Sequence, residues 1–259
     1  MCVSCGCSIP LTDHDDPANL TVADVQRAAS AAGLPLMEAA FNIPRTLAVA
    51  TQGGDWPPAD DPLTHRPVLV FDCDGILSFT SEAICTALNA RFGTTYSPAS
   101  QGFFPGSLRA DRLPDAQGAW IAGEIRQPAF VSACAPDFHA MDVLRDAFEA
   151  GYECCVATER DPSLKEATAR WLHDWGAPPV EVHATGHGQK PAFMAGRYGP
   201  ARPAVLIDDS PLAQVSIAGP GVQVWSPQRP YTPGMARDHV RVFAGWPVAR
   251  YWLGLGPQA

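Results

Sequence analysis

The sequence predicts an α/β fold in which helices cover both faces of a parallel sheet. Short, continuously apolar runs recur from position 68 onward, and such runs are typical of strands buried on both faces. Amphipathic segments of helical length separate these runs, and three of them stop at a glycine. With 259 residues the chain is long enough to bury the core of one large domain and to carry a smaller module as well.

The expected elements follow one another from position 67. The first strand, VLVF at 68–71, precedes a helix at 81–92 that stops at Gly93. Residues 94–137 contain several prolines and glycines and are expected to be irregular. The remaining expected helices are 140–150, which stops at Gly151, and 163–175, which stops at Gly176. The remaining expected strands are 152–157, 180–184, 204–207 and 222–225.

Residues 1–66 differ from the rest and are expected to form a small helical module in front of a domain over residues 67–259. Three cysteines head this module. An Ala-rich stretch that begins at Thr21 predicts one helix, and a second short helix is expected at 35–42. Residues 51–67, TQGGDWPPADDPLTHRP, have the Gly, Pro and Asp content of a linker.

Charge and composition exclude several classes of protein. Lys and Arg total 18 against 27 Asp and Glu, a net charge of −9, and a chain this acidic is a poor binder of nucleic acid polymers. A small phosphorylated substrate stays compatible with it, because a bound cation inverts the local charge. No apolar run is long enough for a membrane span, and the N-terminus lacks a secretory signal. The expected compartment is a reducing cytoplasm, where the eight cysteines are thiols or metal ligands.

Polar residues follow three of the predicted strands, where each strand ends, and a lysine lies in a loop between the third and fourth strands. These residues are Asp72, Asp74, Thr158, Lys190, Asp208 and Asp209. Because the carboxyl ends of parallel strands lie at one edge of a sheet, these side chains are expected to converge there. Gly75 permits a tight turn that brings Asp72 and Asp74 to face one pocket.

Such a cluster suits phosphoryl chemistry. Neighbouring carboxylates repel one another unless a hard cation neutralises them, and oxygen ligands suit Mg²⁺. One carboxylate can attack phosphorus to give an aspartyl-phosphate, and a second can protonate the leaving oxygen and then activate water. A hydroxyl and an ammonium can hold the phosphoryl oxygens as charge moves.

Four motifs in this order resemble the haloacid dehalogenase (HAD) superfamily from about Val68 to Ser210. They are an apolar strand followed by Asp72-Cys73-Asp74-Gly75, then Thr158 ending a strand, then Lys190, and then the pair Asp208-Asp209. The resemblance implies a Rossmann-like sheet with a helical cap inserted at about residues 79–137. The cap would close over the site and exclude water.

The resemblance also implies a role for each residue. It makes Asp72 the nucleophile and Asp74 the general acid and base. The phosphoryl-binding residues it implies are Thr158 and Lys190. The Mg²⁺ ligands it implies are Asp72, the backbone carbonyl of Asp74, Asp208, and Asp209 directly or through water.

Local residues favour phosphomonoester hydrolysis over other chemistries of the superfamily. Dehalogenases lack a carboxylate two residues after the nucleophile, where Asp74 stands here. Phosphonoacetaldehyde hydrolases use a cap lysine, and no lysine lies between Gly75 and Thr158. P-type ATPases carry lysine after the nucleophile, where this chain has Cys73. Phosphoryl transfer to an acceptor other than water stays open.

Two stretches resemble the 5′(3′)-deoxyribonucleotidase branch: the Phe- and Pro-rich cap leading into FHAMDVLRDAFEAGYECCVAT, and the tail VQVWSPQRPYTPG with HVRVFAGW. They imply a nucleotide as substrate, although Glu159-Arg160 stands where that branch has Ser-Pro. Three cap aromatic residues could stack on a base or form the core of the cap: Phe103, Phe104 and Trp120. Three arginines could meet a second phosphate or lie in solvent: Arg109, Arg112 and Arg126.

The N-terminal cysteines support an alternative function. Cys2, Cys5 and Cys7 offer three soft thiolates that suit Ni²⁺, Zn²⁺ or Cu⁺. This head is similar to the Cys-x-x-Cys-Gly-Cys start of hydrogenase nickel-insertion GTPases, over seven residues only, and the chain has no phosphate-binding P-loop. The alternative is a non-catalytic carrier or sensor of a soft metal. A redox-active thiol cluster and an unliganded tail are the other interpretations.

Overall fold

The computed structural model describes Arg27 and residues 66–98, 113–228 and 238–255. The chain divides into two units, Met1–Pro58 and Ala59–Ala259, and the elements below belong to the second. Apart from Arg27, the residues covered by the predictions for 1–65 lie outside the described residues. So do four of the candidate cap residues, Phe103, Phe104, Arg109 and Arg112.

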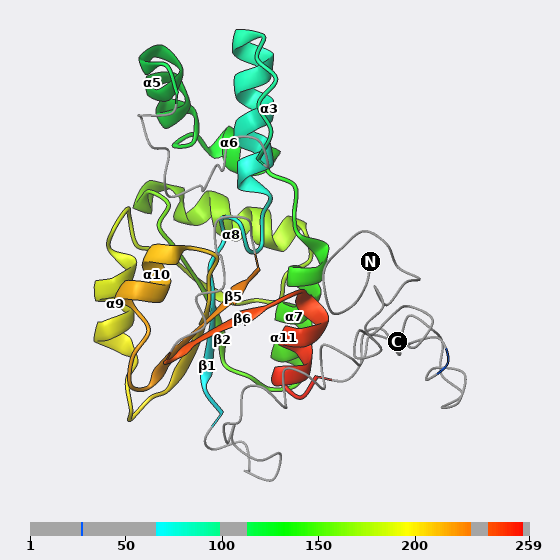
Figure 1. The fold of residues 1–259 in the computed structure, drawn as a ribbon, viewed down its shortest axis with the longest axis vertical. Coiled ribbons are helices and arrows are strands. Elements are labelled where there is room, and N and C mark those ends of the chain that lie inside the picture. Colours follow the sequence, from blue (N-terminus) through cyan, green and yellow to red (C-terminus); the bar gives the residue numbers. More distant parts are fainter. Residues whose placement is uncertain (1–26, 28–65, 99–112, 229–237, 256–259) are drawn as a thin grey trace, which may run out of the picture. The chain divides into compact units, whose positions relative to one another are not determined.

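A six-stranded sheet, parallel throughout, forms the centre of the second unit, in the order β3-β2-β1-β4-β5-β6 (Figure 1). The strands are β1 (Val68–Phe71), β2 (Cys154–Thr158), β3 (Glu181–Ala184), β4 (Ala204–Ile207), β5 (Val222–Pro227) and β6 (Val240–Phe243). The first five were predicted, and β6 was not. The register sets the ends of β1 and β4 side by side, with Phe71 opposite Ile207.

The central strands are apolar at every position because helices cover both faces of the sheet. All four residues of β1 and of β4 are buried. On one face, Val68 and Val70 pack in a cluster with Met194 of α9 (Lys190–Arg197) and Ala213 of α10 (Pro211–Ser216). Helices α7 (Phe138–Glu149) and α11 (Trp246–Trp252) lie on the opposite side of the sheet (Figure 1). The predicted fold class is confirmed.

The described helices of the second unit lie between these strands and after β6. They are α3 (Thr80–Phe92), α5 (Asp115–Glu124), α6 (Pro128–Ala133), α7 (Phe138–Glu149), the 3-10 turn η2 (Pro162–Leu164), α8 (Lys165–Asp174), α9 (Lys190–Arg197), α10 (Pro211–Ser216) and α11 (Trp246–Trp252). As predicted, α3 ends at Gly93 in the left-handed conformation. Among the described residues, no helix combines the length and apolar character that crossing a bilayer requires.

The prediction that residues 94–137 are irregular is wrong, because α5 and α6 lie within them. With α3 they form a helical layer beyond the sheet edge, where α3 and α5 rise away from the strands (Figure 1). The layer has its own apolar cluster, made by Ile84, Leu88 and Ile121 among others. The sequence of α5, DAQGAWIAGE, does not predict a helix because it contains two glycines, which lower helix propensity.

Candidate active site

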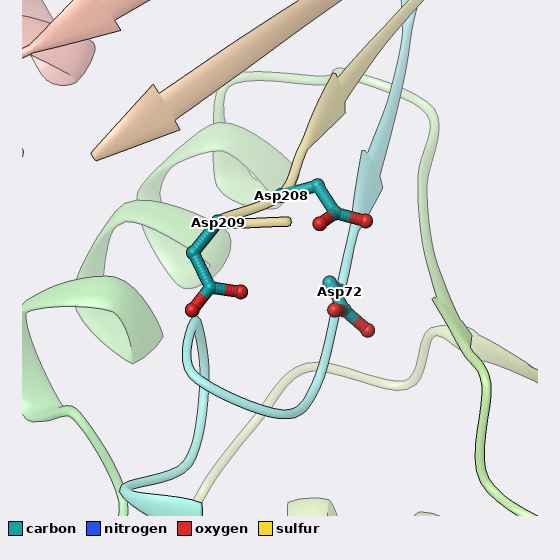
Figure 2. A group of neighbouring side chains, drawn as sticks. All are labelled: Asp72, Asp208 and Asp209. Carbon is teal, nitrogen blue, oxygen red and sulfur yellow. The ribbon is translucent and has the colours of Figure 1, made fainter. Parts of the chain in front are cut away.

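Three carboxylates meet at the carboxyl ends of two neighbouring strands. Asp72 directly follows β1, and Asp208 and Asp209 directly follow β4 (Figure 2). One oxygen from each lies within 4.8 Å of the others, and all three residues are buried. The parallel pairing of β1 with β4 brings them together, as the order of apolar run and acidic residue predicts.

A tight turn after β1 carries Asp74 to the same site. The amides of Leu77 and Ser78 both donate to the Cys73 carbonyl, and Gly75 takes a φ of 81°. That conformation favours glycine, and a β-carbon at Gly75 would lie only 2.3 Å from Oδ2 of Asp209. The turn thus places Asp74 in the cavity that Asp72 lines, and the missing side chain of Gly75 leaves space for Asp209.

Lys190 connects the two strand ends from the base of the cavity. Its Nζ lies 2.9 Å from Oδ1 of Asp72 and 2.8 Å from Oδ2 of Asp208, and the side chain is 3% exposed. The prediction that Lys190 lies in a loop is wrong, because it is the first residue of α9. Pro191 follows it, and proline is favoured at the start of a helix because its nitrogen needs no partner there.

Burial and charge act against each other on Asp72. Burial raises its pKa well above the ordinary value, and the nearby carboxylates add to the rise, whereas Lys190 lowers it. Burial also acts to lower the pKa of Lys190, but Asp208 and Asp72 more than offset this effect, and the pKa is raised. Lys190 therefore keeps its charge and is the cation that holds Asp72 and Asp208 together.

Arg160 is a site residue that the sequence prediction did not include. Its guanidinium forms an ion pair with the Asp74 carboxylate, with Nη2 2.6 Å from Oδ1 and Nε 3.0 Å from Oδ2. The side chain is 7% exposed and lines the same cavity. Its position at a strand end, two residues after Thr158, is the signal that could have pointed to it.

Arg160 decides the charge of Asp74. Burial alone would raise the Asp74 pKa, but the Arg160 guanidinium and a hydrogen bond from Thr80 bring it below the ordinary value. In this arrangement Asp74 is ionised and suited to accept a proton. Its expected role as a proton donor therefore needs a change in its contact with Arg160.

Thr158, the last residue of β2, is fully buried beneath this pair. Its hydroxyl donates to Oδ2 of Asp74 over 3.3 Å, and it does not belong to the cavity lining. The hydroxyl that was expected to hold a phosphoryl group thus faces Asp74 here, and its phosphoryl-binding role stays a prediction.

A cavity of about 570 Å³ opens above these residues, between the sheet edge and the helical layer. Its outer walls carry Arg126 and Phe130 from the helical layer, together with Glu159 and the exposed His187. Trp120 is not among the lining residues. It packs edge-on against Phe92, so the interpretation that it forms part of the cap core is the one that fits.

No protein-family model and no curated protein matches the chain, whereas solved structures match it in fold. A haloacid dehalogenase-like family hydrolase from Streptococcus pneumoniae aligns with a TM-score of 0.51 at 14% identity, over 72% of this chain and 98% of that one. This chain has the haloacid dehalogenase-like fold. Two further matches have TM-scores of 0.47. CbbY from Rhodobacter sphaeroides in complex with phosphate aligns at 21% identity over 71% of this chain and 96% of that one. A HAD family hydrolase from Deinococcus radiodurans R1 with bound phosphate and sodium aligns at 18% identity over 72% of this chain and 94% of that one.

The carboxylates at this edge of the HAD-like sheet fit a hard divalent cation. Asp72, Asp208 and Asp209 offer only oxygen donors, which Mg²⁺ prefers, and they lie close enough to share one ion. Such a cation would also relieve the repulsion among carboxylates, which adds to the effect of burial in raising the pKa of Asp72. The described residues therefore fit the predicted magnesium site.

Proposed function

We propose that the chain is a Mg²⁺-dependent phosphomonoester hydrolase that works through an aspartyl-phosphate on Asp72. One observation carries the proposal: the Asp72 carboxylate lies buried at the sheet edge, paired with Lys190 and within reach of Asp208 and Asp209, and it lines a cavity. A buried carboxylate in contact with a lysine, facing a cavity large enough for a small molecule, suits a nucleophile.

Asp72 has one oxygen available for attack. Its Oδ1 accepts hydrogen bonds from both the Cys73 amide, over 2.7 Å, and Lys190. Oδ2 accepts none from the described residues. In the proposed first step Oδ2 forms a bond to phosphorus, and the ester bond between phosphorus and the leaving oxygen breaks. The alcohol leaves with a proton from Asp74.

Asp74 serves both steps of the proposed reaction. After donating its proton it is a carboxylate, which can take a proton from the water that attacks phosphorus. The acyl-phosphate bond then breaks, inorganic phosphate leaves and Asp72 is regenerated. Lys190 and Thr158 are the proposed phosphoryl-binding residues, and Lys190 is close enough to Asp72 to hold an oxygen of the transferring group.

Mg²⁺, held by Asp72, Asp208, Asp209 and the backbone carbonyl of Asp74, would supply positive charge for the phosphoryl oxygens. The carboxylates present support this assignment through their number, their oxygen donors and their closeness. The charge balance also favours a bound metal ion. The four carboxylates of the site outnumber its two positively charged side chains, Lys190 and Arg160, so the site is net negative until a metal ion binds.

A nucleotide is the proposed substrate class. Residues of the helical layer line the outer cavity, where Phe130 and Ile125 could contact an apolar group and Arg126 an anionic one. The tail that resembles the nucleotidase branch supplies β5, β6 and the first residue of α11. Both features are compatible with a nucleoside monophosphate, whose base would occupy the outer part of the cavity.

A phosphate-release screen tests this function. The full chain with Mg²⁺ is assayed against nucleoside monophosphates, sugar phosphates and phospho-amino acids. We expect release from at least one nucleotide and its loss when EDTA replaces Mg²⁺. Absence of hydrolysis across the panel, combined with tight binding of Ni²⁺ or Zn²⁺ that Cys2/Cys5/Cys7→Ser removes, would favour the metal-carrier alternative instead.

A further inference from the structure

Arg160 presents five N–H donors in one plane at the inner end of the cavity. Nε and Nη2 hold Asp74, Nη2 also lies 3.4 Å from Oγ of Ser78, and Nη1 donates to Oγ1 of Thr168 over 3.2 Å. These contacts use four of the five donors. The second N–H of Nη1 makes no hydrogen bond with the residues that the structure describes.

We propose that Arg160 is a substrate ligand that binds the phosphoryl group of the substrate. The inference rests on the proposed phosphatase function. In binding, Arg160 offers its remaining N–H to a phosphoryl oxygen, and one of the two nitrogens that donate to Asp74, Nε or Nη2, turns to the phosphoryl group instead. A planar guanidinium matches two oxygens of a phosphoryl group, and this pairing is among the stronger charge-assisted hydrogen bonds.

The position of the guanidinium supports this role. It touches Asp74, lines the cavity that Asp72 and Lys190 line, and is anchored from behind by Thr168 on α8. A buried and anchored arginine has already lost most of its side-chain freedom, so binding a phosphoryl group costs little further entropy.

The ion pairs at the site also favour Arg160 as a phosphoryl ligand. Lys190 is shared between two carboxylates, Asp72 and Asp208, so its charge is already balanced. Arg160 has a single carboxylate partner, Asp74. Lys190 and Arg160 are the two cations with buried side chains that line the cavity among the described residues, and Arg160 is the one shared by fewer carboxylates.

Binding of inorganic phosphate tests the inference without needing turnover. The full chain with saturating Mg²⁺ is titrated with phosphate by calorimetry, as wild type and as Arg160→Gln. We expect the Arg160→Gln variant to bind phosphate about tenfold or more weakly, the effect of losing a charged hydrogen bond. Arg170→Gln is the matched control: the same change on the exposed side of α8, and its phosphate affinity should stay at the wild-type level.

A double-mutant cycle separates phosphate binding from mere support of Asp74. In an Asp74→Asn background the Arg160–Asp74 ion pair no longer exists, and a folded protein no longer depends on it. We expect Arg160→Gln to weaken phosphate binding about tenfold in this background too, and Arg160→Lys to keep part of the affinity because it retains the charge.

The outcomes are distinct. Weaker phosphate binding by Arg160→Gln in both backgrounds supports the proposal. If the Asp74→Asn chain binds phosphate equally well with and without the added Arg160→Gln substitution, the proposal is overturned, because Arg160 then acts only as the partner of Asp74. A wild-type chain that hydrolyses phosphomonoesters while Arg160→Gln binds phosphate normally refutes this inference alone. A wild-type chain that neither binds phosphate nor hydrolyses any ester refutes the proposed function as well.

Discussion

Gly75 lies so close to Asp209 that a β-carbon on it would overlap the carboxylate, at 2.3 Å from Oδ2 and 2.8 Å from the carboxyl carbon. The glycine belongs to the turn after β1, and the aspartate follows β4. The contact therefore joins the two strand ends that carry the acidic cluster. Any residue other than glycine at position 75 would place its β-carbon in the space that the Asp209 carboxylate occupies.

Gly75→Ala is expected to weaken Mg²⁺ binding and to abolish most hydrolysis, because Asp209 must move away from Asp72 and Asp208. Gly151→Ala is the matched control: its φ is 84° against 81°, and nothing lies within 4 Å of its β-carbon. Both variants should lose about 1 kcal/mol of stability from backbone strain. Calorimetric titration with Mg²⁺ should give a lower affinity for Gly75→Ala only, and equal affinities would contradict the assigned cluster.

Asp72→Asn is expected to be more stable than wild type in Mg²⁺-free buffer at neutral pH. The folded-state pKa of Asp72 is raised, so its contribution to stability is fully present below its unfolded value of about 3.9 and is lost as pH rises through the folded pKa. The stability advantage of the Asn variant should thus appear as pH rises through that window. Thermal unfolding at pH 4 and pH 8 measures it, and a variant that is less stable at both would contradict the assignment.

The strand-end acids could be predicted from the sequence because a continuous apolar run ending in Asp leaves few alternatives. VLVF and AVLI are too short for buried helices, and parallel pairing brings their ends to one edge. This reasoning predicts that Asp72 and Asp208 meet. It needs no knowledge of the loops.

Arg160 and the helical layer could not be predicted in this way. The partner of Arg160 depends on the path of the turn through Gly75, which is a three-dimensional property and leaves no periodic pattern in the sequence. Helix α5 is held by contacts of Ile121 within its cluster, and its own glycines and alanines give a weak pattern. Strand β6 contains partly exposed as well as buried positions and lacks a long apolar run.

Lys190→Met should destabilise the protein by about 3–5 kcal/mol in Mg²⁺-free buffer, because it leaves two buried carboxylates without their cation. Added Mg²⁺ should restore part of the loss, since a cation at the cluster replaces some of the missing charge. Lys165→Met, at the chain's other lysine, which is exposed, is the control and should unfold like wild type. Denaturant unfolding with and without Mg²⁺ measures both. A loss below about 1 kcal/mol, the size expected of a surface pair, would argue against a buried ion pair.

The five described cysteines should be unreactive in the folded protein. All are buried thiols, and burial raises the pKa of Cys73 to about 12 and that of Cys134 to about 11. After denaturation a thiol reagent at pH 8 should modify all eight cysteines of the chain. In the native chain it should leave the five buried cysteines unmodified and react with Cys2, Cys5 and Cys7 at most. Rapid native modification of Cys73 would contradict the burial of the turn.

Chemical trapping of the aspartyl-phosphate tests the central claim most directly. The full chain is mixed with Mg²⁺ and a hydrolysed phosphomonoester, quenched, and reduced with borohydride, which converts an aspartyl-phosphate to homoserine. Peptide mass spectrometry should find homoserine at position 72 in wild type and none in Asp72→Asn, which should also lose hydrolysis. Homoserine at another aspartate, or full hydrolysis by Asp72→Asn, would contradict the assignment of Asp72 as the nucleophile.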